Sequence, residues 1–267
     1  MMRITSEMLI AALRSDEFAI AYQPIFELPE NRPVAMEALL RWHKPGFGVV
    51  PPDSFISEIE GHPIEANFVA WMLRTAWKAS QAWMTPQRAM SMAINVSPAM
   101  LTPQLEDLIA QHWPATKRLE VEITERLPIV DVQIAQRTVE SLGRKGVHVL
   151  FDDYYGSREC CRRLNSLPFT GVKFDRSLIP KDSRIAIETL FALARIIHAK
   201  GLSITAEGVE RPEHIVAAQL AGVRRWQGYW GGRPMPESEV RDWLMQGYPN
   251  IRTATSQTEC DTADLDG

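Results

Sequence analysis

The chain has 267 residues and 45% of them are hydrophobic, so it can bury a full core in one large domain or two small ones. Its 29 basic and 33 acidic residues give a net charge of -4, which argues against a nucleic-acid-binding surface, and we expect no DNA partner. No stretch approaches the ~20 apolar residues that span a bilayer, and we expect no membrane insertion. The three cysteines, Cys160, Cys161 and Cys260, have no CxxC spacing, which favours a reducing, cytoplasmic compartment over a disulfide framework or a zinc site.

Apolar and β-branched runs predict eight strands, most of them separated by amphipathic helical patterns. The predicted strands cover residues 18–28, 34–42, 90–97, 119–124, 148–153, 171–175, 202–209 and 225–232. The predicted helices cover residues 65–83, 103–113, 131–146, 184–201 and 211–222. This alternation favours a parallel sheet with crossover helices, and the number of strands favours closure into a barrel.

The connection between the first two strands does not fit an all-parallel barrel. Only PENRP separates them, and a parallel crossover needs roughly a dozen residues or more. The first pair is therefore predicted to be an antiparallel hairpin, and the fold an α/β, modified TIM (β/α)8 barrel with an antiparallel first strand. We expect an N-terminal helical segment at 1–17, the barrel domain at 18–248, and a polar, disordered tail at 249–267.

Acidic and amide residues lie inside or at the carboxyl ends of these predicted strands. The carboxyl ends of parallel barrel strands point to one face, so the side chains are expected to converge there. Burying an ionised carboxylate without a partner costs several kcal/mol, so such a set needs cations. The residues are Glu37, Asn95, Glu122, Asp152, Asp153, Asp175 and Glu207.

The chemistry of this set favours a divalent-metal site for phosphodiester hydrolysis. Ligands that are all oxygen suit magnesium or manganese. Neighbouring side chains diverge at a strand end, so one of Asp152 and Asp153 could bridge while the other reaches a second ion. Two ions roughly 3.5–4 Å apart would activate a water and stabilise an in-line displacement at phosphorus.

Several of these residues also have simpler interpretations. A single acid near a strand end is more often a turn former or a helix N-cap than a ligand. Lys173 could pair with Asp175, two residues on along one strand face, and Arg41 could form a surface salt bridge or bind phosphate through two hydrogen bonds. Three tryptophans suggest base stacking, although core packing is the favoured role. They are Trp71, Trp77 and Trp83.

Eight ordered strings resemble the EAL-domain phosphodiesterases that cleave cyclic di-GMP, over about residues 18 to 246. The strings are YQPIFEL, MEALLRW, INVS, EITE, FDD, VKFDRSLI, AEGVE and QGYWGGRPMP. The resemblance implies hydrolysis of one of the two phosphodiester bonds of cyclic di-GMP, giving linear pGpG. It also implies two Mg²⁺ or Mn²⁺ ions, a homodimer contact and a role in the switch between motility and biofilm.

The resemblance further implies a role for each matching residue. Glu37, Asn95, Glu122 and Asp152 resemble the ligands of a first metal; Asp153 resembles the ligand of a second, with Asp152 bridging and Asp175 close by. The implied catalytic residues are Asp153, Lys173, which contacts the nucleophilic water, and Glu207, a general base or metal-site organiser. The implied substrate-binding residues are Gln23, Leu39, Arg41, Gln227 and Glu210. Glu125 matches an acid that anchors the loop after Asp153.

That loop departs from the family pattern. Active members usually read close to DDFGTGYSS, whereas this chain reads DDYYGSREC, so that Tyr155 and Ser157 replace both glycines and Arg158 replaces an aromatic residue. A tyrosine adopts glycine-like backbone conformations only at a steric penalty, so the loop is expected to follow a different path. A working phosphodiesterase is favoured because every identified metal ligand is present. A cyclic di-GMP receptor or protein-interaction module, and a nonspecific nuclease or phosphatase, stay open as alternatives.

Overall fold

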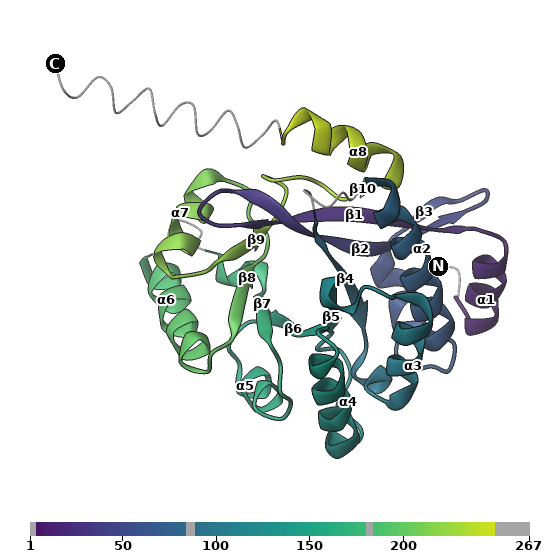
Figure 1. The fold of residues 1–267 in the computed structure, drawn as a ribbon, viewed down its shortest axis with the longest axis horizontal. Helices are drawn as coiled ribbons and strands as arrows, with labels where there is room; N and C mark the ends of the chain where they lie inside the picture. Colours follow the sequence, from purple (N-terminus) through teal and green to yellow (C-terminus); the bar gives the residue numbers. More distant parts are fainter. Residues whose placement is uncertain (1–3, 84–88, 180–183, 249–267) are drawn as a thin grey trace.

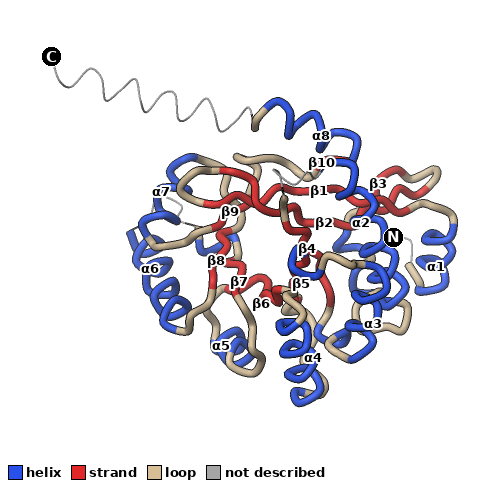
Figure 2. The backbone as a smooth tube through the Cα atoms, in the orientation of Figure 1, coloured by secondary structure: helices blue, strands red, loops and turns tan. Residues whose placement is uncertain are grey.

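The computed structural model describes residues 4–83, 89–179 and 184–248, which form a closed barrel of strands with helices outside it (Figures 1 and 2). The strands are β1 (Phe18–Glu27), β2 (Arg32–Lys44), β3 (Gly48–Val50), β4 (Ser91–Val96), β5 (Leu119–Ile123), β6 (His148–Tyr154), β7 (Gly171–Phe174), β8 (Ser203–Ala206), β9 (Arg225–Gln227) and β10 (Met235–Pro236). The helices are α1 (Ser6–Arg14), α2 (Glu65–Trp83), α3 (Pro103–His112), α4 (Val132–Arg144), α5 (Arg158–Leu164), α6 (Arg184–Ala199), α7 (Pro212–Leu220) and α8 (Glu237–Gln246).

The barrel closes through β1, which confirms the predicted reversed strand. β1 pairs antiparallel with both β2 and β9, whereas the pairs from β2 through β4 to β9 are parallel. The register places Gln23 opposite Glu37 and Ile25 opposite Gln227. One reversed strand therefore brings residues from both ends of the sequence to the same place.

Two strands and two α-helices of the described residues were not predicted from the sequence. β3 and β10 are too short, at three and two residues, to show an alternating pattern. α5 has only seven residues, and α8 begins with acidic residues and buries Val240 and Leu244. The strands predicted at 202–209 and 225–232 are shorter in the structure, so Glu207 lies just after β8 rather than inside it.

The core prediction for the tryptophans is confirmed. Trp83 is 4% exposed and packs edge-on against Tyr22, with ring centroids 5.8 Å apart. Trp77 makes a similar contact with Trp113 at 5.1 Å, and Trp71 packs against the core while partly buried. Edge-to-face aromatic pairs of this kind stabilise a core beyond the area they bury.

The N-terminal segment contains the packed helix α1. α1 packs through Leu9 and Ala12, with Thr5 as its N-cap. The predicted tail at 249–267 lies outside the described residues, as does Cys260. Among the helices that the structure describes, none is both long and apolar enough to cross a membrane.

Candidate active site

Lys173 lies at the centre of a group of buried carboxylates. Its side chain is 1% exposed and stands on β7 in the barrel interior. Its Nζ lies 2.6 Å from Glu207 Oε1, 2.8 Å from Glu122 Oε2, 3.2 Å from Asp152 Oδ1 and 3.6 Å from Glu37 Oε2. The four acids come from β2, β5, β6 and the loop just after β8, so residues far apart in the sequence converge on one ammonium group.

The alternative pairing of Lys173 with Asp175 is wrong. Asp175 Oδ1 instead accepts a hydrogen bond from Ser177 N at 2.9 Å and caps the 3-10 helix η5 (Arg176–Leu178). Because the ammonium of Lys173 is buried, it needs charged partners inside the barrel, and these come from other strands and not from its own.

Charged side chains of the strands form two layers inside the barrel. β5 is buried along its whole length, and Glu120 and Glu122, two residues apart, face the same side of it. Glu120 pairs with Arg225 at 2.9 Å, whereas Glu122 pairs with Lys173. The first layer is a balanced ion pair, but in the second a single cation faces several acids.

Burial, together with this excess of acid, raises the pKa of several of these carboxylates. Burial above all, together with neighbouring carboxylates and against the pull of Lys173, raises the pKa of Glu207 to about 8 and that of Asp152 to about 6. Burial likewise raises the pKa of Glu122 well above its ordinary value, and Glu122 Oε1 is buried with no hydrogen-bond partner among the described residues. Unpartnered buried oxygens and surplus negative charge fit a site for additional cations.

A bulge brings the two adjacent aspartates together. The pairing of β6 with β7 is irregular between Phe151 and Tyr154, and Asp153 has a φ of 52°, in the left-handed region. Oxygens of Asp152, Asp153 and Glu207 consequently lie within 4.8 Å of one another. The expectation that the two side chains diverge is wrong, because a left-handed residue interrupts the alternation of the strand. Aspartate is one of the residues that tolerates this conformation.

Amide side chains hold Glu37 in place. Asn95 Nδ2 donates to Glu37 Oε1 and Gln227 Nε2 donates to Glu37 Oε2, both at 2.7 Å. Gln227 Nε2 also lies 3.0 Å from Gln23 Oε1, and Gln23 Nε2 donates to the Gly232 carbonyl at 3.1 Å. Burial alone would raise the pKa of Glu37, but Lys173 and these hydrogen bonds lower it below its ordinary value, so Glu37 is held as a carboxylate.

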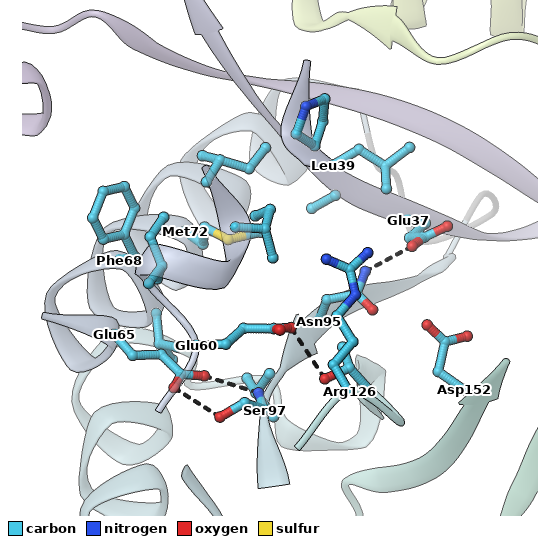
Figure 3. Close-up of a pocket in the computed structure, with 18 of the residues that line it drawn as sticks. Glu37, Leu39, Glu60, Glu65, Phe68, Met72, Asn95, Ser97, Arg126 and Asp152 are labelled. Atoms are coloured by element: carbon cyan, nitrogen blue, oxygen red, sulfur yellow. Dashed lines mark hydrogen bonds between the residues drawn. The ribbon is translucent and has the colours of Figure 1, made fainter. Parts of the chain in front are cut away.

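Two cavities meet over this charge cluster. They measure about 250 and about 280 Å³, and both are lined by Glu37, Leu39 and Asp153. The sequence-predicted residues that line the larger cavity alone are Gln23, Asp175, Glu207, Glu210 and Gln227. Those that line the smaller cavity alone, which Figure 3 shows in part, are Arg41, Asn95 and Asp152.

Three of the predicted residues lie outside both cavity linings. Lys173 and Glu122 are buried beneath them. Glu125 lies beside Asp153: after burial, the charge of Glu125 is the largest cause that raises the pKa of Asp153 to about 6. The predicted residues thus form one connected region, with two compartments above a buried floor.

The loop after Asp153 places its left-handed residue at Gly156 and not at Tyr155. Neither Tyr155 nor Ser157 has a positive φ; the left-handed conformation falls on Gly156, with a φ of 81°. Ser157 instead caps α5, where its Oγ accepts from Cys160 N at 3.1 Å. Tyr155 therefore avoids the steric penalty of a left-handed conformation, since Gly156 stands where the backbone needs a glycine.

Sequence reasoning missed three charged residues of the smaller cavity. Glu60 and Glu65 belong to a stretch with no strand pattern, and Glu65 accepts hydrogen bonds from Ser97 N at 2.8 Å and Ser97 Oγ at 2.7 Å. Arg126 directly follows Glu125, so its place after a strand end was the available signal.

The sequence matches a known protein family and several known proteins. The family model described as EAL domain matches residues 6–234. An uncharacterized protein, sll1895, of Synechocystis sp. is 32% identical over 248 residues, which cover 88% of this chain and 35% of that protein. The cyclic di-GMP phosphodiesterase NbdA of Pseudomonas aeruginosa is 29% identical over 250 residues, which cover 89% of this chain and 31% of NbdA. The chain spans about a third of the length of these two relatives.

Solved structures agree with the family match. The EAL enzyme Bd1971, in its form with cAMP and cyclic di-GMP bound, has a TM-score of 0.77 and 26% identity, covering 89% of this chain and 67% of that one. The PaMucR phosphodiesterase in complex with cyclic di-GMP has a TM-score of 0.76 and 25% identity, covering 88% and 98%. The match of the family model over most of the sequence, together with the modified barrel, shows that the chain belongs to the EAL domain family.

Proposed function

We propose that this chain hydrolyses cyclic di-GMP to linear pGpG with the help of two divalent ions, magnesium or manganese. The observation that carries the proposal is the surplus of buried carboxylates around Lys173, with oxygens of Asp152, Asp153 and Glu207 within 4.8 Å of one another. Such a cluster is costly without cations and complete as a set of oxygen donors.

The residues divide between holding ions and handling substrate. Glu37, Asn95, Glu122 and Asp152 would hold one ion, and Asp152 and Asp153 would hold the other. When bound, the ions supply an activated water and neutralise charge on the reacting phosphate. The water oxygen forms a bond to phosphorus, the bond from phosphorus to the 3′ oxygen breaks, and that oxygen takes up a proton.

Protein groups complete the reaction centre in this proposal. Lys173 favours the ionised form of the surrounding carboxylates and contacts the attacking water, and Glu207 accepts the proton of that water or organises the ions. Arg41 lines the smaller cavity, and a half-buried guanidinium suits a phosphate oxygen pair. Leu39 stands where the two cavities meet, so the dinucleotide would lie across it with one half on each side.

The second candidate is a receptor that binds cyclic di-GMP without turning it over. The altered DDYYGSREC loop favours it, because Tyr155 is 49% exposed beside Asp153 where the family usually has a glycine. The complete ligand set favours the enzyme, since a pure receptor has no need of so costly a cluster. A homodimer contact through this loop and a barrel domain at 18–248 belong to the same proposal.

The test is incubation of purified protein with cyclic di-GMP and Mg²⁺ or Mn²⁺, following pGpG by chromatography. Metal-dependent product that is lost in Glu37→Ala and kept in the matched surface variant Glu140→Ala supports the enzyme. Binding with calcium and no product with either metal would support the receptor. Hydrolysis of simple chromogenic phosphodiesters that cyclic di-GMP fails to inhibit would indicate a nonspecific phosphodiesterase instead.

A further inference from the structure

Arg126 reaches into the cavity that adjoins the proposed metal site. It follows β5 by three residues and lines the smaller cavity together with Glu37, Asp152 and Asp153. Figure 3 shows its side chain in the pocket between Glu60 on one side and Asp152 on the other. A substrate held at the acids would therefore extend toward Arg126.

The guanidinium of Arg126 is weakly engaged by the protein. Its ion pair with Asp53 is long, at 3.6 Å, and the two side chains are 42% and 90% exposed. Exposed pairs of this kind contribute little to stability, so this pairing holds the guanidinium only weakly. Its donors can turn to a ligand at small cost.

Glu60 supplies a fixed acceptor beside this donor. Its Oε1 accepts a hydrogen bond from Thr124 Oγ1 at 3.1 Å, which orients the carboxylate in the cavity. Burial raises the pKa of Glu60 and the charge of Arg126 opposes that shift, so the two side chains act on each other. No salt bridge within 4.0 Å joins them in the described part of the chain.

Part of the cavity wall is apolar. Ile59, Phe68, Val69 and Met72 line it, and all four are buried. A cavity with apolar walls and a few convergent polar groups is the usual form of a small-molecule site. A flat aromatic ring would contact these walls with its faces and meet Arg126 and Glu60 with its edge.

Guanine is the base whose edge matches this pair of side chains. Its O6 and N7 accept hydrogen bonds and pair with arginine in a bidentate manner, while its N2 amino group and N1–H on the adjacent edge are donors for a carboxylate. Adenine carries an amino group in place of O6, so it would set donor against donor at Arg126. A site built on such hydrogen bonds rejects the base that cannot make them.

We propose that Arg126 and Glu60 form a guanine-specificity site, which binds one base of the cyclic dinucleotide in the smaller cavity. The inference rests on the proposed function for its ligand, but it concerns binding and not the hydrolytic step. Arg126 is here a specificity-determining residue, with Arg41 left to the phosphate.

The experiment measures dissociation constants of the whole protein with calcium present, so that binding is separated from hydrolysis. The probes are cyclic di-GMP, cyclic di-AMP and cyclic di-IMP, which keeps O6 and N7 but lacks the N2 amino group. We expect Arg126→Gln to weaken cyclic di-GMP and cyclic di-IMP binding about 5- to 100-fold, the loss of one bidentate base contact, and to reduce the preference over cyclic di-AMP by the same factor.

Two further variants test the contact with Glu60 and provide a control. Glu60→Ala should weaken cyclic di-GMP more than cyclic di-IMP, because only the former offers the N2 donors. Arg137→Gln, an exposed arginine on α4 away from the cavity, is the matched control and should change no affinity. Melting temperatures of all variants identify any loss that comes from misfolding.

Two outcomes would overturn the inference. Unchanged cyclic di-GMP affinity in Arg126→Gln would show that the base does not reach Arg126, and equal losses for cyclic di-GMP and cyclic di-AMP would show a phosphate contact instead. If the parent protein binds cyclic di-GMP but makes no pGpG, the proposed hydrolysis fails while the specificity site is still tested. If the parent binds no cyclic di-GMP at all, both fail.

Discussion

Lys173 Nζ lies 2.8 Å from Glu122 Oε2, and the two side chains are 1% and 0% exposed. This buried pair connects β7 with β5, the two neighbours of β6, and the other acids of the site lie around it. A single ammonium group thus keeps the protein folded around a set of charges that it does not fully neutralise.

Replacing Lys173 should therefore destabilise the metal-free protein. We expect Lys173→Met to lower the free energy of unfolding by about 3–5 kcal/mol in EDTA, because the acids lose their buried cation. Urea denaturation measures the change. The control is Lys145→Met, which removes an exposed ion pair with Glu106 and should cost less than about 1 kcal/mol. Similar losses in both variants would contradict the central role given to Lys173.

Metal binding should stabilise the protein and depend on Asp152. At a Mn²⁺ concentration of about 100 times the dissociation constant, the parent should gain about 2.7 kcal/mol of unfolding free energy. Asp152→Asn removes one crowded charge, so the metal-free variant should be at least as stable as the parent, yet gain almost nothing from Mn²⁺. Asp107→Asn, exposed on α3, should respond as the parent does. Thermal unfolding with and without metal decides between these outcomes.

Gln227 should tune metal affinity through Glu37. Its Nε2 lies 2.7 Å from Glu37 Oε2, so Gln227→Leu leaves that carboxylate free to turn. Loss of such an orienting hydrogen bond lowers metal affinity about 10- to 100-fold, and titration calorimetry with Mn²⁺ measures it. Gln136→Leu removes a hydrogen bond to the Ser166 carbonyl on the surface and serves as the control. Equal Mn²⁺ affinity in the two variants would refute this role.

We expect Gly156→Ala to reduce pGpG formation by more than its loss of stability explains. Both Gly156 and Gly201 have left-handed φ angles, of 81° and 73°, so alanine at either should cost roughly 1–2 kcal/mol. A Cβ at Gly156 would also lie 2.9 Å from Leu193 Cδ1, whereas Gly201 has open space. Because Gly156 follows Asp153 by three residues, we expect only Gly156→Ala to reduce pGpG formation. An equal effect of both variants on pGpG formation would argue against a role of the loop in catalysis.

Local sequence patterns were enough to predict the barrel and its reversed strand. The five-residue connection excludes a parallel crossover, and the buried strands show as apolar runs whatever their neighbours are. The acids at the strand ends stood out for the same reason, since a charge in an apolar run is unusual. Their convergence on one face then follows from the parallel direction of the strands.

Other features were decided only by contacts between distant segments. The partners of Lys173 and the convergence of Asp152 with Asp153 both differ from the simplest local interpretation. Glu60 and Arg126 line one cavity although they lie 66 positions apart in the sequence, a separation that no periodic pattern predicts. A sequence determines which residues are buried or lie at a strand end, because these depend on local composition; charge pairing, bulges and cavity walls depend on which strands come together in space.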